Sequence, residues 1–200
     1  MKKPPARAEG GLAPGFLVAS PSLRDPNFQG SLVLMARHDA EGSLGFVVNR
    51  AAQVRSGDVL QAVDPAMRAV SRAVGRDQVP VLVGGPVQPE RLWILWRPGV
   101  VPAGEEDLRI AGGLAVGGSK ALLEAVSSND DAGPYQLLLG YAGWGPMQVE
   151  GEVAAGAWIP LGLMEDLVFE VPMEERWDEA VRRLGLPPGG FTVGSGGALA

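Results

Sequence analysis

Cysteine is absent from this chain of 200 residues, and histidine occurs only once, at His38. Without thiols the chain can form no disulfide, no thiolate nucleophile and no cysteine-ligated zinc site. The run from His38 to Gly42 offers carboxylates beside the imidazole, but it has neither the length nor the spacing of a calcium-binding loop. We therefore expect neither a metal ion nor a cofactor.

Long apolar runs and positive charge are lacking as well. No stretch of about 18 apolar residues is present, so the sequence predicts no membrane-spanning helix. The formal net charge is −6, which makes direct nucleic-acid binding unlikely as a function because such partners require a positive surface. The basic residues at the N-terminus precede no apolar segment, so they do not form a secretory signal, and we expect a cytoplasmic protein.

Glycine and proline, in contrast, are abundant, with 29 and 17 copies. Their number indicates many turns and close backbone approaches. They are concentrated near both ends, where no apolar periodicity is visible. We therefore expect flexible tails at residues 1–14 and 187–200, the second rich in glycine, around one domain that spans residues 15–186.

Short apolar or alternating runs within this domain predict β-strands, and apolar residues at helical spacing predict helices. The expected strands and hairpins are 15–20, 32–37, 44–50, 79–87, 91–99, 107–118, 135–143 and 147–153. The expected helices are 56–74, interrupted at Pro65, 119–128, capped by Ser119, and 173–185. Because strands and helices do not alternate, the pattern predicts an α+β fold with a mixed or antiparallel sheet.

Two features suggest an enzyme. His38 follows Ser22 and Asp25 closely in the sequence, and a relay of such groups would suit a hydrolase, although the simpler interpretation is a loop histidine between two strands. The loop 113–120 resembles a phosphate-binding loop, but its serine precedes its lysine, the reverse of the usual order. Its glycines and Ser119 equally fit a turn followed by a helix cap.

The segment GYAGWGPMQVEGE, residues 140–152, places two aromatic residues among glycines. Tyr141 and Trp144 could form core corners or an exposed recognition surface, and the sequence favours neither. If residues 147–153 form a strand, Gln148 and the two following glutamates share one polar face. We expect that face to contact water or arginine side chains.

Four segments together resemble the YqgE/AlgH family of bacterial proteins: residues 16–50, 81–95, 137–159 and 174–185. The resemblance covers about residues 15–186. It implies one compact α+β domain with a coiled, mixed or antiparallel sheet and a few flanking helices, in a cytoplasmic protein. The family has no established enzymatic activity, although one member is labelled a transcriptional regulator of alginate production. This chain departs from the family at Trp96, where relatives typically carry histidine, and in lacking a histidine-containing C-terminal end.

The residues and the resemblance together predict a non-enzymatic domain that is either regulatory or binds a ligand or partner, and the partner would be an unknown protein or small molecule. The alternatives are a hydrolase or phosphoryl-handling enzyme and a transcriptional regulator. We expect segments 20–28, 84–91 and 141–152 to meet on one face. The candidate residues, none of them assigned a catalytic role, are Ser22, Asp25, Phe28, His38, Asn49, Gly84, Gly85, Arg91, Tyr141, Trp144, Gln148 and Glu150.

Overall fold

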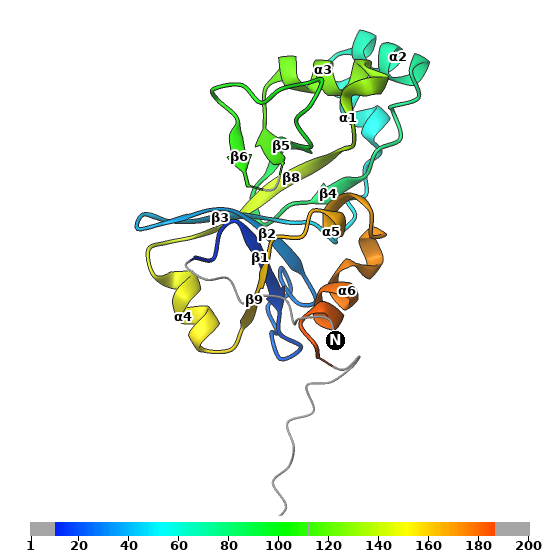
Figure 1. The fold of residues 1–200 in the computed structure, drawn as a ribbon. Helices are drawn as coiled ribbons and strands as arrows, with labels where there is room; N and C mark the ends of the chain where they lie inside the picture. The colour runs from blue at the N-terminus through cyan, green and yellow to red at the C-terminus, as the bar shows by residue number, and fades with distance from the viewer. Residues whose placement is uncertain (1–10, 112, 187–200) are drawn as a thin grey trace, which may run out of the picture.

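The computed structural model describes residues 11–111 and 113–186 (Figure 1). The first strand begins at Gly15, where the sequence places the start of the domain. Leu12 and Ala13, however, already pack against a buried cluster, so the packed body begins before the expected boundary. The remainder of the two expected tails, residues 1–10 and 187–200, lies outside the described residues.

In the described part of the chain, nine strands form a sheet in the order β6-β7-β5-β8-β3-β2-β1-β9, with β4 parallel to β8 beside this path. The other pairings are antiparallel. The strands are β1 Gly15–Ala19, β2 Leu32–Asp39, β3 Gly42–Val47, β4 Val81–Val83, β5 Val87–Trp96, β6 Leu108–Ile110, β7 Leu114–Gly117, β8 Tyr135–Trp144 and β9 Trp158–Gly162. The expected α+β class with a mixed sheet is confirmed.

The helices are α1 Ser56–Val63, α2 Pro65–Ala73, α3 Lys120–Ser128, α4 Gln148–Ala154, α5 Asp166–Phe169 and α6 Arg176–Arg183, with 3-10 turns η1 at Asp130–Ala132 and η2 at Met173–Glu175. The expected break at Pro65 is confirmed, and Asp64 caps the helix that follows it. The Ser119 cap is also confirmed, because its hydroxyl accepts a hydrogen bond from Leu122 N–H. None of these described helices combines the length and the hydrophobicity needed to cross a bilayer.

The strand expected at 147–153 is wrong, because these residues form α4. Val149 and Val153, the apolar residues of that alternation, are four residues apart and therefore also share one face of a helix. Both pack against the cluster beneath α4. Met147, the residue before the helix, has φ of 61°, a left-handed conformation in the turn between β8 and α4. Strand β9 and helix α5 have no counterpart in the sequence-based prediction.

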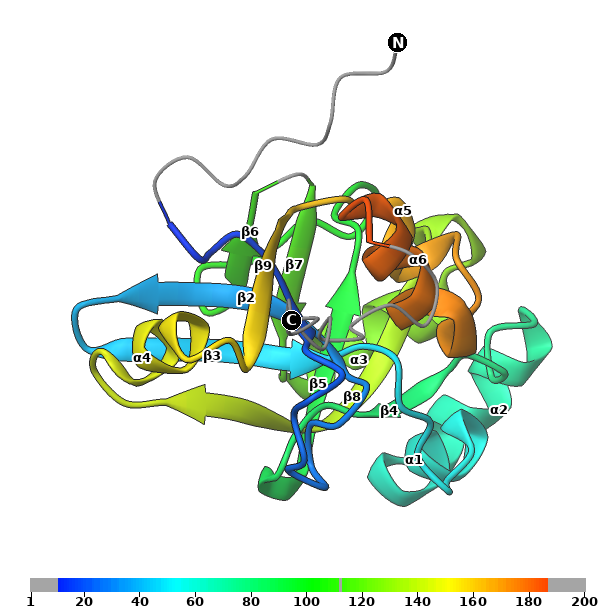
Figure 2. The same ribbon diagram turned by 90° about the horizontal axis from the view of Figure 1, so that it is seen from below.

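Strand β8 is the central element, since its first half pairs with β4 and β5 and its last residues pair with β3. Because side chains alternate along each strand, the two faces of the curled sheet contribute to different buried apolar clusters. Helices α1–α3 cover one side of β4, β5 and β7, while α4 and the α5–α6 pair cover opposite sides of β1, β2 and β3 (Figures 1 and 2). A cleft lies between the α5–α6 region and the start of β8.

Candidate functional site

Two of the expected surface residues, Gly84 and Gly85, connect β4 to β5 where that connection passes over β8. A Cβ atom on Gly84 would lie 2.4 Å from the carbonyl oxygen of Gly140, and one on Gly85 would lie 2.3 Å from the backbone of Tyr141. Gly85 also has φ of 154°, which other residues rarely adopt. Both glycines are therefore required for close packing of backbone on backbone.

Arg91 and Tyr141 lie on the side of the sheet that faces α5 and α6. The guanidinium carbon of Arg91 lies 4.1 Å from the ring centroid of Trp93. The ring of Trp93 in turn meets Tyr141 edge-on at 6.2 Å between centroids. Tyr141 is partly buried against the cluster that includes residues of both helices.

Trp144 points to the other side, because it follows Tyr141 by three residues and strand side chains alternate. Its ring lies 6.0 Å from that of Phe28 and 6.0 Å from that of Trp158, measured between centroids. One carboxylate oxygen of Glu152 accepts hydrogen bonds from the indole N–H groups of Trp144 and Trp158, at 3.0 and 2.8 Å. With 6% of its surface exposed, Trp144 is a core residue whose polar atom has a partner.

The expectation of one continuous surface is therefore wrong. Phe28, Trp144 and Gln148 lie together on the α4 side, whereas Tyr141 and Arg91 lie on the α5–α6 side. Within α4, Gln148 donates to Glu152 at 2.9 Å, as residues four apart on a helix can. The sequence could not anticipate this division because it depends on the α4 helix and on the curl of the sheet.

Ser22, Asp25 and Asn49 shape the loop between β1 and β2. The Ser22 hydroxyl lies 2.8 Å from that of Ser20, and the Asp25 carboxylate accepts a hydrogen bond from Asn27 N–H at 2.8 Å. Asn49 holds the end of this loop next to β2, because its side chain accepts a hydrogen bond from Leu32 N–H and donates one to the carbonyl of Gly30. Asp25 and Asn49 thus bond to backbone groups of this loop, and the Ser22 hydroxyl bonds to a neighbouring side chain.

His38 is a residue of β2, not of a loop. Its Nδ1 lies 2.8 Å from the Ser43 hydroxyl and its Nε2 lies 3.7 Å from a carboxylate oxygen of Glu150. This order of hydroxyl, imidazole and carboxylate resembles a catalytic relay. Ser43, however, is only 7% exposed and lies in β3 between β2 and β8, so its hydroxyl does not face a substrate.

The loop 113–120 forms the end of a hairpin and the start of α3. Gly113 makes the turn between β6 and β7 with φ of 79°, and Ser119 is the cap of α3. The Lys120 ammonium forms an ion pair with Asp64 at 2.9 Å. The side chains of Ser119 and Lys120, which a phosphate-binding loop would present to its ligand, therefore both have protein partners.

A cleft with a volume of about 580 Å³ lies at a place that the sequence did not indicate. Its walls come from three segments: residues 75–80 before β4, residues 133–136 at the start of β8, and residues 169–176 from α5 to α6. Most of the wall is apolar, with Val79, Phe169 and Met173 among its residues. A smaller cleft of about 340 Å³ shares Val79 and Met173 and continues toward α1.

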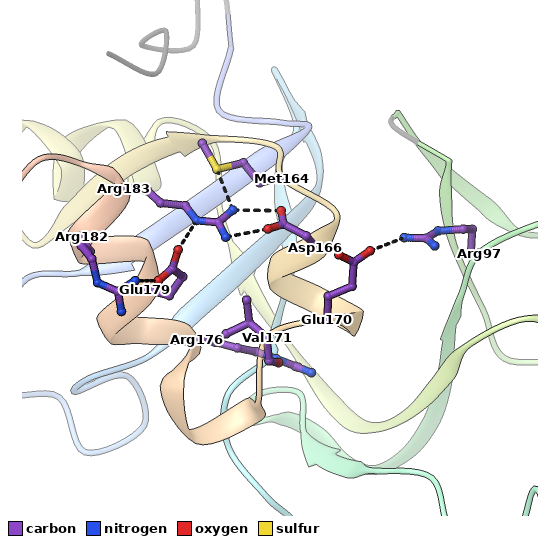
Figure 3. A network of polar contacts seen from close by, with 9 residues as sticks. All are labelled: Arg97, Met164, Asp166, Glu170, Val171, Arg176, Glu179, Arg182 and Arg183. Carbon is purple, nitrogen blue, oxygen red and sulfur yellow. Dashed lines mark hydrogen bonds and ion pairs between the residues drawn. The ribbon is translucent and has the colours of Figure 1, made fainter. Parts of the chain in front are cut away.

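Arg176 is the charged group at the base of this cleft, and it is only 3% exposed. Its Nε donates to the carbonyl of Val171, and Nη1 donates to the carbonyl of Val48 and to Gln136 Oε1. Gln136 is held in that orientation because its amide donates to the Val168 carbonyl at 2.7 Å. All these acceptors are neutral. Figure 3 shows Arg176 beside Val171, apart from the ion pairs of Arg183.

Burial lowers the pKa of Arg176 to about 10, an effect that the nearby Glu174 carboxylate partly opposes. The guanidinium therefore stays protonated at neutral pH. In residues 11–111 and 113–186 no carboxylate approaches it within ion-pair distance. Burying a charge without a close counter-ion is costly.

Tyr135 and Arg76 form the opposite wall. The Tyr135 hydroxyl donates to the Arg76 carbonyl at 2.8 Å, and the guanidinium of Arg76 lies 4.9 Å from the tyrosine ring centroid. Arg76 donates hydrogen bonds to the carbonyls of Val126 and Gly133, and it therefore connects the segment before β4 to the end of α3 and to the start of β8. Burial raises the pKa of Tyr135 to about 12, which makes its phenol a hydrogen-bonding group and not a base at neutral pH.

The sequence offers one indication of this site, namely a charged residue on the apolar side of a helix. Arg176 precedes Ala180 by four residues and so lies on the buried stripe of α6. The cleft itself could not be anticipated, because its walls are separated by more than thirty residues at each step along the chain. Within the described residues, no three His, Asp or Glu side chains converge so that they could hold a metal ion.

The fold and this cleft define a single-domain α+β protein in which a curled, mostly antiparallel sheet carries an apolar cleft with a buried arginine. The AlgH-like family model, DUF179, matches residues 16–189. The chain belongs to this family, which confirms the resemblance seen in the sequence.

Relatives and solved structures agree with this assignment. The chain is 61% identical to a UPF0301 protein of Anaeromyxobacter dehalogenans over 98% of its own length and all of that protein, and 31% identical to one of Vibrio parahaemolyticus over 92% and 97%. It also matches the solution structure of the AlgH protein from Pseudomonas aeruginosa, with a TM-score of 0.73, 29% identity, and coverage of 99% and 100%. A crystal structure of a Corynebacterium diphtheriae protein shares the fold, with a TM-score of 0.69 and 20% identity over 89% of each chain.

Proposed function

We propose that this protein is a non-enzymatic ligand-binding protein and that a small molecule occupies the cleft formed by residues 75–80, 133–136 and 169–176. The volume of about 580 Å³ carries this proposal, because pockets for small molecules typically measure roughly 300–1,000 Å³. Apolar walls with a few oriented polar groups are the usual composition of such sites. Here Tyr135, Gln136 and Arg176 supply those groups.

The contacts of the alternative catalytic groups support binding over catalysis. Ser43 is buried within the sheet, and the ammonium of Lys120 is paired with Asp64. The regulator alternative requires a continuous face of free basic side chains for DNA. Arg50 and Arg76, by contrast, donate to backbone carbonyls, and Arg68 pairs with Asp58.

A cavity-filling substitution tests this function. Met173 is half-buried and lines both clefts, so Met173→Trp should occupy ligand volume without removing a polar group. The matched control is Val63→Trp at an exposed position on α1. Each protein would be equilibrated by dialysis against a small-molecule extract of the native cell, and retained compounds would be identified by mass spectrometry.

We expect the wild-type protein and Val63→Trp to retain the same compounds and Met173→Trp to lose them. Equal retention by Met173→Trp would place the ligand outside this cleft. No retention by the wild-type protein, with each variant confirmed as folded by circular dichroism, would count against a small-molecule ligand altogether.

A further inference from the structure

The guanidinium of Arg176 differs from the other arginines that donate to carbonyl groups. Arg50 donates to the carbonyls of Pro26, Asn27 and Gln29 in an exposed setting, where water screens its charge. Arg176 makes similar bonds to neutral acceptors but is only 3% exposed. If holding carbonyls were its whole role, this buried positive charge would be offset only in part, by the Glu174 carboxylate beyond ion-pair distance.

The second terminal nitrogen of the Arg176 guanidinium, Nη2, makes none of the described hydrogen bonds. The described hydrogen bonds of Arg176 use Nε and Nη1. An arginine fork offers five N–H groups in a plane, and its geometry suits the two oxygens of a carboxylate. Because Arg176 lines the cleft, a ligand can reach this side of the fork.

The remaining charges narrow the class of anion. Arg76, Glu170 and Glu174 also line the cleft. The Arg76 guanidinium is engaged by backbone carbonyls, and Glu170 lies 4.0 Å from Arg97. Both carboxylates are exposed at the rim, and their negative charge repels a ligand with a second negative charge. The walls between rim and base are apolar and include Val79, Phe169 and Met173. A ligand that fits this cleft carries a single negative charge at one end and has an apolar body.

From these observations we propose that the cleft binds a monocarboxylate with an apolar body, with its carboxylate on Arg176 and its body against Val79, Phe169 and Met173. This inference rests on the proposed ligand-binding function and adds the chemical class. The carboxylate neutralises the buried charge, and the Glu170 and Glu174 side chains at the rim select against phosphate dianions.

The test uses three probes of similar shape: benzoate, its neutral isostere benzamide, and phenyl phosphate. Each would be titrated into the full-length protein, with binding followed by amide chemical shifts in ¹H–¹⁵N spectra. We expect saturable binding of benzoate, with shifts concentrated in residues 133–136 and 169–176. Benzamide and phenyl phosphate should each bind at least tenfold more weakly, since a charge-assisted hydrogen bond is lost in one case and repulsion is added in the other.

Variants then assign the effect to Arg176. Arg176→Gln should weaken benzoate binding at least tenfold and remove the preference over benzamide, whereas Arg50→Gln, the matched loss of a carbonyl-bound arginine, should change neither. If Arg176→Gln does not fold, Arg176→Lys keeps the charge without the planar fork, and it should bind benzoate more weakly than the wild-type protein does while still preferring it to benzamide.

The outcomes separate the two proposals. Equal affinity for benzoate and benzamide, blocked by Met173→Trp, would leave the ligand-binding function in place and overturn the carboxylate assignment. Tighter binding of phenyl phosphate than of benzoate would overturn the carboxylate assignment in favour of a phosphate ligand. Shifts outside the cleft, or no saturable binding of any probe, would overturn the carboxylate assignment while the retention experiment above decides whether the cleft binds another molecule.

Discussion

At the residue scale, Glu152 connects the two tryptophans beneath α4. One of its carboxylate oxygens accepts both indole N–H groups and the other accepts from Gln148. Glu152→Ala would leave two nearly buried N–H groups without a partner, at a cost of about 1–3 kcal/mol each. We expect a loss of at least ~2 kcal/mol in the free energy of unfolding, measured by urea denaturation.

The control for this change is Glu41→Ala, at an exposed position in the β2–β3 turn, which should stay within about 0.5 kcal/mol of the wild-type protein. An equally small change for Glu152→Ala would show that water replaces the carboxylate.

Two glycines give opposite expectations for the same substitution. Gly85→Ala would place a Cβ atom 2.3 Å from the backbone of Tyr141, so the β4–β5 connection must move away from β8. We expect a loss of ~2 kcal/mol or more. Gly151→Ala, in α4, meets nothing within 4 Å and should stabilise the protein by about 0.5–1 kcal/mol through helix propensity. Thermal melting of both variants checks the pair, and a neutral Gly85→Ala would contradict the close approach.

The sequence predicted what depends on local chemistry and missed what depends on side-chain direction across the fold. Ser119 and Pro65 act where their types indicate, at a cap and at a helix break. Tyr141 and Trp144 are neighbours in the chain and were expected on one surface, yet β8 directs them to opposite sides. Arg176 was missed because its environment is built by Val48 and Gln136, both distant in sequence.

At the element scale, the short helix α5 is fastened to α6 by charge. Arg183 forms two hydrogen bonds to Asp166, at 2.9 and 2.6 Å, and a third to Glu179 in its own helix (Figure 3). Arg183 holds the pKa of Asp166 below its ordinary value, mainly through these hydrogen bonds. A lowered pKa in the folded state means that the pair stabilises the protein only while Asp166 is ionised.

Asp166→Asn should therefore reduce the free energy of unfolding at pH 7 by up to about 1 kcal/mol, since the pair is partly exposed to solvent. That difference is fully present above the ordinary pKa of an aspartate, about 3.9, and should shrink as the pH falls below it. Urea denaturation at pH 7 and pH 3 measures both values. A difference of the same size at both pH values would mean that the substitution acts through packing and not through charge.

Element α4 shows why the sequence pattern misled at this scale. Residues 147–153 alternate in polarity, but the same residues place Val149 and Val153 on one helical face, and seven residues are too few to separate the two periods. The deciding features are Met147 in a left-handed conformation and the cap-like bond from Gly145 N–H to Gln148.

At the scale of the whole molecule, the cleft is where three segments distant in sequence meet. Residues 75–80 follow the α1–α2 pair, residues 133–136 open β8, and residues 169–176 lead into α6. Arg76 holds the first segment to the second through the Gly133 carbonyl, and Gln136 holds the second to the third through the Val168 carbonyl and Arg176. A ligand on Arg176 would therefore contact walls contributed by all three segments.

This arrangement predicts the pattern of amide hydrogen exchange when the cleft is occupied. With benzoate at saturating concentration, we expect slower exchange in residues 75–80, 133–136 and 169–176 together, because opening any one wall then requires losing the ligand. Exchange in the loop 21–30 and in α4 should not change, since these lie on the other side of the sheet from α5 and α6. Mass spectrometry of peptides after timed exchange resolves these segments. Protection confined to residues 21–30 and 148–152 would instead locate the ligand on the side of the sheet that carries Trp144. The cleft beside Arg176 would then not be the ligand site.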